Sequence, residues 1–272
     1  MTFGFPEEQQ EFQERNPRFV EVLPAFKERI DQVVSREFMP ANLAQRIVFG
    51  LGKLAAEDFM EILLNCANGY GMAGLKLLRP MFEVTVTAMY LARHEDEVEQ
   101  FMDYHYVHQR KSLMIAADVG ADLGAIVTEA QRRAVEEAYQ AVRPRYRQVI
   151  CAKCQTEREL ASWSKKDLMA MAREVNLGRA ALGLYFLPTL QIHTTPTRLL
   201  SRLEETGEGL RFKVGAQPIQ ADRAMMGAHV CMALLLEDLN RYLRLGIGDL
   251  EVALRDGVAH AWPTVRPKGE EA

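Results

Sequence analysis

The stretch from Leu75 to Lys111 constrains the fold of this chain more than any other part of the sequence. Its first half is predominantly apolar. After an acidic segment at 94–99, its second half returns to an amphipathic pattern. Apolar residues that recur every three to four positions are typical of helices that bury one face. The stretch therefore predicts two long antiparallel helices joined by an acidic corner.

The same helical spacing continues through most of the chain, and a convincing strand signal occurs in one segment, where apolar and basic residues alternate between glycines. We therefore predict an all-α fold, a bundle of long antiparallel helices with at most one small β-hairpin near 209–216. The main helices are expected at 54–70, 75–91, 95–117, 129–150, 179–193 and 221–245, with the fourth of these interrupted by Pro144.

A chain of 272 residues is long enough to bury a large core, and no internal repeat stands out. We expect a single helical domain over 1–272. Within it we expect an N-terminal helical extension at 17–53, a core at 54–203, a C-terminal helical cap at 219–262 and a tail at 263–272.

The net charge and the lengths of the apolar runs restrict which functional classes of protein are possible. The formal net charge of −4 does not suggest a general nucleic-acid binder. No apolar run approaches the length needed to cross a bilayer, and the N-terminus lacks the basic and apolar regions of a secretory signal. Four cysteines in a chain of this length do not resemble a disulfide framework. These features predict a cytoplasmic protein without a membrane partner.

Two groups of residues carry a family resemblance. The first comprises Arg79-x-x-x-Glu83, Tyr90, Phe101-Met102-Asp103-Tyr104 and Tyr106; the second comprises Trp163, Met169-Ala170-Met171-Ala172, Tyr185 and Ile192-His193-Thr194-Thr195-Pro196. In order and approximate spacing they resemble a bacterial family of uncharacterised helical proteins, a domain-of-unknown-function family, over roughly 54–203. Leu190 stands where that family usually has a serine. The resemblance implies a helical fold and no established activity.

Arg79 and Glu83 stand four residues apart, so they share a helix face and can pair. One interpretation is structural: a solvent stripe, or a buried ion pair that fixes helix register. The other is functional, with Arg79 holding a phosphate or carboxylate and Glu83 orienting it. His193 also has a structural and a functional interpretation. A histidine at a helix end can cap carbonyls, or it can act as a general acid or base.

Metal binding is not expected. His105 and His108 are three residues apart, but no good third ligand lies at matching spacing, and Cys151-x-x-Cys154 has no second cysteine pair. Helical spacing places Cys151 and Cys154 with Ile150 on one apolar face, so we expect these thiols to pack in the core. No cofactor is predicted.

The segment Arg255-Asp256-Gly257-Val258-Ala259-His260 resembles the Arg-polar-x-x-x-His motif of HEPN ribonucleases. In that family the arginine and the histidine act on RNA without metal, usually across a dimer. The resemblance therefore implies Arg255 and His260 as catalytic residues and a homodimer as the active form. Arg223 and His229 also satisfy a loose version of this spacing.

Basic residues interleaved with Tyr139 and Tyr146 form the best basic patch, and such a mixture suits single-stranded nucleic acid. A solvated helix face diluted by glutamates is the commoner explanation. The basic members of the patch are Arg132, Arg133, Arg143, Arg145, Arg147 and Lys153.

The leading functional hypothesis is a pocket between helices that binds or acts on a phosphate-bearing ligand, most plausibly RNA, and its sharpest version is a metal-independent ribonuclease of defence or toxin type. We expect the pocket to be lined by Arg79, Glu83, Tyr104, His108 and His193. The alternative is a non-enzymatic helical interaction or scaffold protein in which these residues are structural. An open cluster favours a site, and a sealed ion pair favours the alternative.

Overall fold

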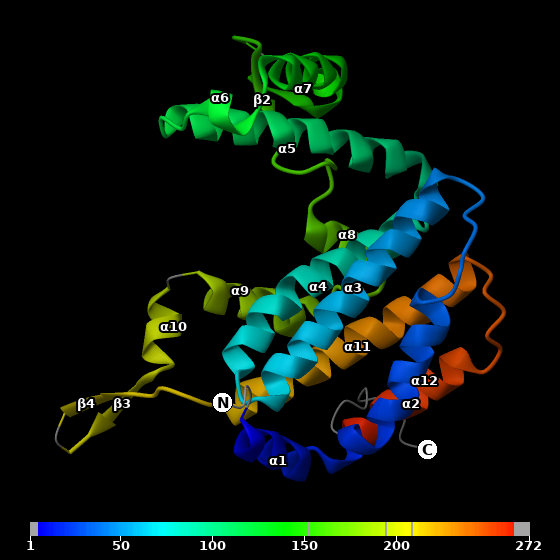
Figure 1. Cartoon of the computed structure of the whole chain (residues 1–272), viewed down its shortest axis with the longest axis vertical. Helices are drawn as coiled ribbons and strands as arrows, with labels where there is room; N and C mark the ends of the chain where they lie inside the picture. Colours follow the sequence, from blue (N-terminus) through cyan, green and yellow to red (C-terminus); the bar gives the residue numbers. More distant parts are fainter. Residues whose placement is uncertain (1–4, 152, 194, 208, 264–272) are drawn as a thin grey trace. The chain divides into compact units, whose positions relative to one another are not determined.

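The computed structural model describes residues 5–151, 153–193, 195–207 and 209–263. Backbone contacts divide the chain into two compact units (Figure 1). Unit 1 combines Met1–Arg93 with Leu168–Ala272, and unit 2 is His94–Asp167. Two compact units can belong to one domain, so the predicted single domain stays a prediction.

Unit 1 is built around three helices, α3 (Leu43–Ala67), α4 (Gly71–Leu91) and α11 (Pro218–Tyr242), each of which packs against the other two. Asn42 caps α3, because its side chain accepts the Gln45 backbone N–H at 2.8 Å. The core between the three helices is made of large apolar side chains, including Phe59, Ile62, Leu78, Met81, Phe82 and Met225.

Shorter elements cover this core. Helices α1 (Pro6–Arg15) and α2 (Pro17–Val34) precede α3, and α12 (Leu250–Ala261) packs against α2 and α11. Between α4 and α11 in unit 1, the chain forms α8 (Leu168–Glu174), the π-helix η3 (Leu182–Phe186), α9 (Leu187–Ile192) and α10 (Pro196–Leu200).

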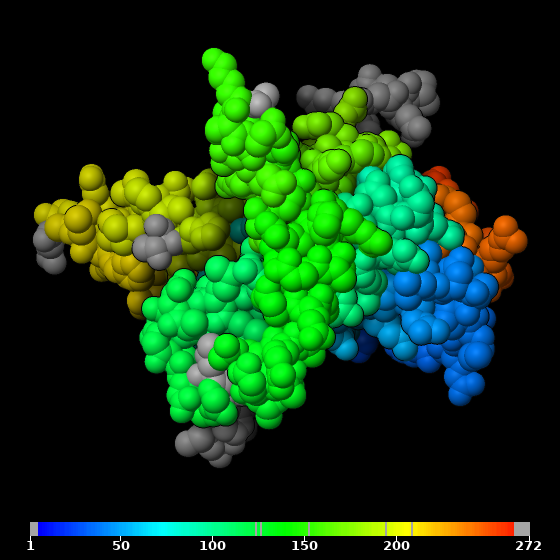
Figure 2. Space-filling model, turned by 90° about the horizontal axis from the view of Figure 1, so that it is seen from above, coloured from blue at the N-terminus to red at the C-terminus, as the bar shows by residue number. Residues whose placement is uncertain are grey.

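The hairpin of unit 1 pairs β3 (Leu203–Thr206) with β4 (Gly209–Phe212) in antiparallel register, close to the predicted position. Apart from half-buried Leu203, its strand residues are exposed. Figure 2 shows the surface of this segment in yellow. A two-stranded hairpin without a covering layer is marginally stable by itself.

Unit 2 contains a 3-10 turn η1 (Glu95–Glu97), α5 (Val98–Asp118), α6 (Leu123–Ile126), α7 (Glu129–Val142), a second 3-10 turn η2 (Arg143–Tyr146), β1 (Arg147–Cys151) and β2 (Thr156–Glu159). Helix α5 packs against α7. The core of unit 2 is aromatic and aliphatic. It consists of Tyr104, Val107, Tyr139, Val142, Tyr146 and Leu160, with Trp163 packed against it.

The all-α class is confirmed. The limit of one hairpin was wrong, because the described chain also pairs β1 with β2 in a second small antiparallel sheet. The helix expected over 129–150 is interrupted near Pro144, as predicted, but it ends at Val142 and does not resume. Pro144 lacks the N–H that a continuing helix needs, and the chain then turns into β1. No described helix combines the length and apolar character required to cross a membrane.

Candidate functional site

The candidate site begins on α4, where Arg79 and Glu83 lie one helical turn apart. The Arg79 Nε donates to the Glu83 carboxylate at 2.9 Å, so the pairing expected from their spacing is present. Helix α4 continues through Pro80 to Leu91. The pair therefore lies in the middle of a helix whose other faces contribute to the core.

A second segment, far along the chain, completes the cluster. Arg79 Nη1 lies 3.3 Å from His193 Nε2, and Arg79 Nη2 donates to the Tyr185 hydroxyl at 3.4 Å. The guanidinium also lies 5.0 Å from the centre of the Tyr185 ring. We call Arg79, Glu83, Tyr185 and His193 the Arg79 cluster. It unites residues from both groups that carry the family resemblance.

Local backbone geometry positions Tyr185 and His193. Tyr185 lies in the π-helix η3, and His193 follows the last residue of α9. The helix predicted over 179–193 is present from η3 through α9. The π-turn of η3 was not predicted, and its wider turn changes which side chains share a face. Single π-turns within helical segments are frequent at functional sites.

The Arg79 cluster is open rather than sealed. The side chains of Arg79 and Glu83 are 24% and 42% exposed, and His193 is exposed. Partial burial works to lower the pKa of Arg79, but hydrogen bonds to Glu83 and Tyr185 outweigh it and raise the pKa. The His193 Nε2 can accept an Arg79 N–H only when Nε2 carries no proton. The cluster thus places a guanidinium, which stays charged, beside a histidine imidazole.

Arg255 and His260 lie elsewhere in unit 1, on α12. Arg255 pairs with Glu251 at 2.7 Å, whereas His260 pairs with Glu21 of α2 at 3.0 Å. These two side chains therefore have separate acidic partners. The structure does not bring them together with the Arg79 cluster, which is formed by α4, η3 and the end of α9.

Tyr104 and His108 belong to unit 2. Tyr104 is buried and donates its hydroxyl to the Leu160 carbonyl oxygen at 3.0 Å, so its polar atom already has a partner. His108 is exposed and lies edge-on to the Tyr104 ring at 4.6 Å. Burial, followed by the nearby charges of Lys111 and His105, lowers the pKa of His108. His108 therefore packs against the aromatic core of unit 2 through Tyr104.

Cys151 and Cys154 do not pack in a core, and this prediction was wrong. Cys151 ends β1 and is half-buried, whereas Cys154 is exposed in the turn before β2. Helical spacing does not apply to a hairpin. The Cys154 sulfur lies 2.8 Å from the Thr156 hydroxyl oxygen. Hydrogen bonds with Thr156 and Cys151 lower the pKa of Cys154 to about 7.

The residues of the basic patch agree with the commoner of the two explanations. Tyr139 and Tyr146 are buried in the core of unit 2, so their rings are not free to stack on bases. Arg145 pairs with Asp103, and Arg147 lies 3.7 Å from Glu157. These arginines therefore belong to a salt-bridged surface and not to an aromatic and basic face. Among the described residues, no three metal-binding side chains gather into a cluster.

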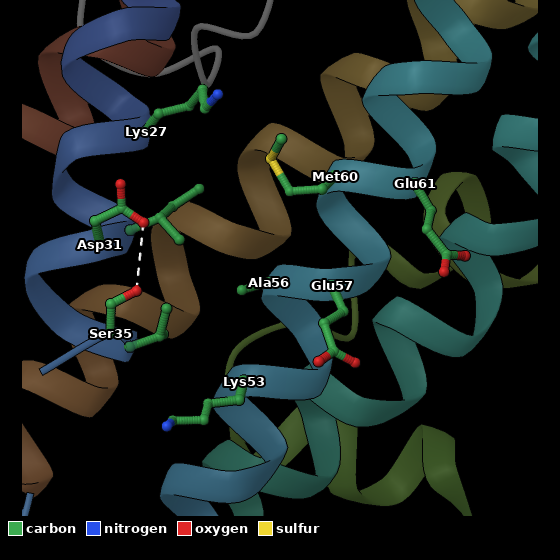
Figure 3. A pocket seen from close by; sticks show the side chains of 10 residues that line it. Lys27, Asp31, Ser35, Lys53, Ala56, Glu57, Met60 and Glu61 are labelled. Carbon is green, nitrogen blue, oxygen red and sulfur yellow. Dashed lines mark hydrogen bonds between the residues drawn. The ribbon is translucent and has the colours of Figure 1, made fainter. Parts of the chain in front are cut away.

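A cavity of about 680 Å³ between α2 and α3 contains none of the predicted site residues. Figure 3 shows Lys27 and Asp31 on α2, and Ser35 directly after it, opposite Lys53 and Glu57 on α3. The Ser35 hydroxyl donates to Asp31 at 3.4 Å. The four-residue spacing of Lys53, Glu57 and Glu61 was a visible signal, but it is equally typical of a solvated helix face.

Comparison with known proteins gives one family. Residues 45–210 match DUF5677, which is described as a family of unknown function. The matched region includes all four residues of the Arg79 cluster and excludes Arg255 and His260. Neither the curated proteins nor the solved structures contain a match to the chain. Because the match covers more than half of the chain, the protein belongs to the DUF5677 family.

Proposed function

We propose that the Arg79 cluster binds the phosphate groups of RNA and cleaves RNA without a metal ion. The observation that carries the proposal is the direct contact of one guanidinium with Glu83, Tyr185 and His193 at an open surface. Glu83 and Tyr185 hold the planar guanidinium in place, and its remaining N–H groups are suited to phosphate oxygens.

In this proposal an Arg79 N–H turns from His193 Nε2 to a phosphate oxygen. The freed Nε2 then removes the proton of an RNA 2′-hydroxyl, and the hydroxyl oxygen attacks the adjacent phosphorus. The bond from phosphorus to the 5′-oxygen breaks, and that oxygen takes a proton from solvent. The products are a 2′,3′-cyclic phosphate and a 5′-hydroxyl end. Arg79 stabilises the negative charge that develops on the phosphate oxygens, and His193 supplies general-base catalysis.

Further positive charge follows His193 along the chain. Among the described residues, Arg198 and Arg202 have no acidic partner. Burial and then the charge of Arg198 lower the pKa of Arg202, which places the two cations in mutual range. Uncompensated cations favour a polyanion over a neutral ligand.

A nuclease site at Arg255 and His260, with a dimer as the active form, is the version that the HEPN resemblance suggests, and it stays a prediction. The separate acidic partners of Arg255 and His260 make the Arg79 cluster the better candidate. His260 therefore serves as the matched histidine control.

A non-enzymatic interaction protein is the second candidate, favoured by the apolar surface of unit 1 between η3 and α11. Large apolar side chains in this segment are about half exposed or more, and solvent-exposed apolar groups of this kind are typical of binding surfaces. They are Leu182, Phe186, Leu187, Leu199, Leu200, Leu210, Phe212, Val214 and Ile219.

The test is incubation of the full chain with mixed RNA in excess EDTA. We expect His193→Ala to slow cleavage at least 100-fold. Arg79→Lys keeps the positive charge but loses the planar array of N–H donors, and it should slow cleavage at least tenfold. His260→Ala should remain within twofold of the wild-type rate. Circular dichroism must show that every variant is folded.

Loss of cleavage in His260→Ala but not in His193→Ala would move the active site to α12. Loss in both variants would indicate a shared or dimeric site. If the folded wild-type protein leaves RNA intact, the nuclease proposal is wrong and the interaction protein becomes the better account.

A further inference from the structure

A second cavity in unit 1, of about 420 Å³, lies among α4, η3, α9, α10 and α11. This volume falls in the range of small-molecule sites. Most of its wall is apolar, and polar groups are few. The lining residues that carry the argument are Leu75, Gly183, Leu187, Gln191, Arg223 and Met226.

The shape of the cavity follows from close packing at its edge. A Cβ atom on Gly227 of α11 would lie 2.7 Å from a Leu184 methyl carbon, so this glycine lets η3 approach α11. Gly183, one residue earlier, has open space where a Cβ would be placed. The π-helix therefore touches α11 at Leu184 and leaves a hollow beside Gly183.

Arg223 is the charged group of the cavity. It is exposed, and no ion pair involves it in the part of the chain that the structure describes. The adjacent acid, Asp222, is already bound to Arg15 and Asn16, at 3.3 and 2.8 Å. A guanidinium beside an apolar wall favours a ligand with one anionic group, because a single positive charge balances a single negative charge.

Gln191 provides an adaptable polar group. Its side-chain oxygen is buried and has no hydrogen-bond partner in the structure. A buried oxygen without a hydrogen bond is energetically unfavourable. Because this oxygen has no hydrogen bond to break, the amide can rotate toward a ligand. Rotation would present a donor or an acceptor to the cavity, as the ligand requires.

We propose that this cavity binds a small amphipathic carboxylate, with its apolar body against the leucines and Met226 and its carboxylate on Arg223. The site is distinct from the Arg79 cluster, and it does not depend on nuclease activity. It adds a ligand-binding function to the segment from η3 to α11.

The test uses two fluorescent probes that share an apolar body and differ in charge. We would titrate the full chain with anionic 8-anilinonaphthalene-1-sulfonate and with neutral N-phenyl-1-naphthylamine. Both should bind with increased fluorescence, and octanoate should displace the anionic probe more effectively than octanol.

Arg223→Gln should raise the Kd of the anionic probe at least tenfold and change that of the neutral probe less than twofold. Arg18→Gln, which removes the same charge from an exposed position on α2, should change neither. Gly183→Leu should fill the cavity and abolish the binding of both probes. Leu187→Trp replaces Gly183→Leu if circular dichroism shows that the glycine variant is unfolded.

Equal binding of the anionic probe by the wild type and by Arg223→Gln would overturn the role of Arg223. Retention of both probes by a folded cavity-filling variant would overturn the location of the site. Failure of octanoate to displace the anionic probe would exclude the carboxylate class. Failure of the wild type to bind either probe would reject the proposal altogether.

Discussion

At the scale of single residues, Arg79 contacts three side chains from two distant segments. Its Nε faces Glu83, and its two terminal nitrogens face His193 and Tyr185. The planar guanidinium can donate hydrogen bonds to three partners in different directions, whereas a lysine ammonium lacks this fixed geometry. The same residue can therefore organise the cluster and still present N–H groups to an anion.

Cys154 is predicted to be the most reactive of the four thiols. Its pKa is lowered to about 7 by hydrogen bonds with Thr156 and Cys151, whereas burial raises the pKa values of Cys66 and Cys231 to about 12. Iodoacetamide should therefore modify Cys154 with a midpoint near pH 7, because the thiolate is the nucleophile.

Thr156→Val should move that midpoint toward the ordinary value of about 8.5. At pH 7 the alkylation rate of Cys154 should consequently fall several-fold, as followed by peptide mass spectrometry. Thr206→Val, a threonine in the other hairpin, is the control. An unchanged midpoint in Thr156→Val would show that the hydroxyl does not stabilise the thiolate.

His229 is predicted to make stability depend on pH. It is buried against Phe19 and Phe26, and its Nδ1 accepts the Trp262 indole N–H at 3.0 Å. Burial lowers its pKa to about 4. Between pH 6.5 and 4 the unfolded chain therefore binds a proton that the folded chain excludes, and stability falls as pH falls.

The loss attributable to His229 should be roughly 2–3 kcal/mol between pH 7.5 and 4.5. Urea unfolding at both pH values would measure it against His229→Gln, which keeps a hydrogen-bond acceptor but does not titrate. The pH-dependent change should be smaller in the variant by that amount. An identical pH dependence in both proteins would contradict the assignment.

At the scale of elements, two glycines are predicted to respond to alanine substitution with opposite changes in stability. Close packing between helices decides the effect at one, and helix propensity decides it at the other. Gly71 begins α4, and a Cβ there would lie 2.1 Å from the Ala221 nitrogen of α11. Gly50 lies within α3, and a Cβ there would meet nothing within 4 Å. The first glycine permits helix packing, whereas the second only weakens its helix.

Gly71→Ala should therefore lower the free energy of unfolding by about 2–3 kcal/mol, because backbone atoms cannot easily move away. Gly50→Ala should raise it by about 0.5–1 kcal/mol through helix propensity. Denaturant unfolding of the two variants measures both effects. Effects of the same sign would show that the glycines do not differ as the contacts imply.

At the scale of the whole molecule, the two compact units predict two regions of local stability. Unit 2, residues 94–167, is the smaller and has a smaller core. Smaller units bury a smaller fraction of their surface and are more marginal. Backbone amides in α5 and α7 should therefore exchange with solvent faster than those in α3, α4 and α11.

A matched pair of core variants tests this division. Val107→Ala in unit 2 and Val48→Ala in unit 1 remove the same groups from buried positions, at a cost of about 2 kcal/mol each. Each should accelerate hydrogen exchange, measured by mass spectrometry, mainly in its own unit. Acceleration across both units by either variant would instead favour the single domain predicted from the sequence.

The sequence predicted local features well. Spacing identified α4, α5 and α11, and it identified the Arg79–Glu83 pair. Each of these depends on residues within a few positions of one another. The prediction of helix up to 150 was wrong, and the π-turn at 182–186 was not predicted, because a short strand and a π-turn are stabilised by neighbours that local patterns do not specify.

What the sequence determined by itself was therefore the helical class and the extent of most long helices, because hydrophobic periodicity and capping act over a few residues. Only the tertiary structure decided that Tyr185 and His193 lie beside Arg79, that Tyr104 belongs to a core, and that Cys154 is exposed in a hairpin. These outcomes depend on contacts between residues that can be more than 100 positions apart, such as Arg79 and His193 at 114. Contacts at that range are selected by the packing of the whole core rather than by any local pattern.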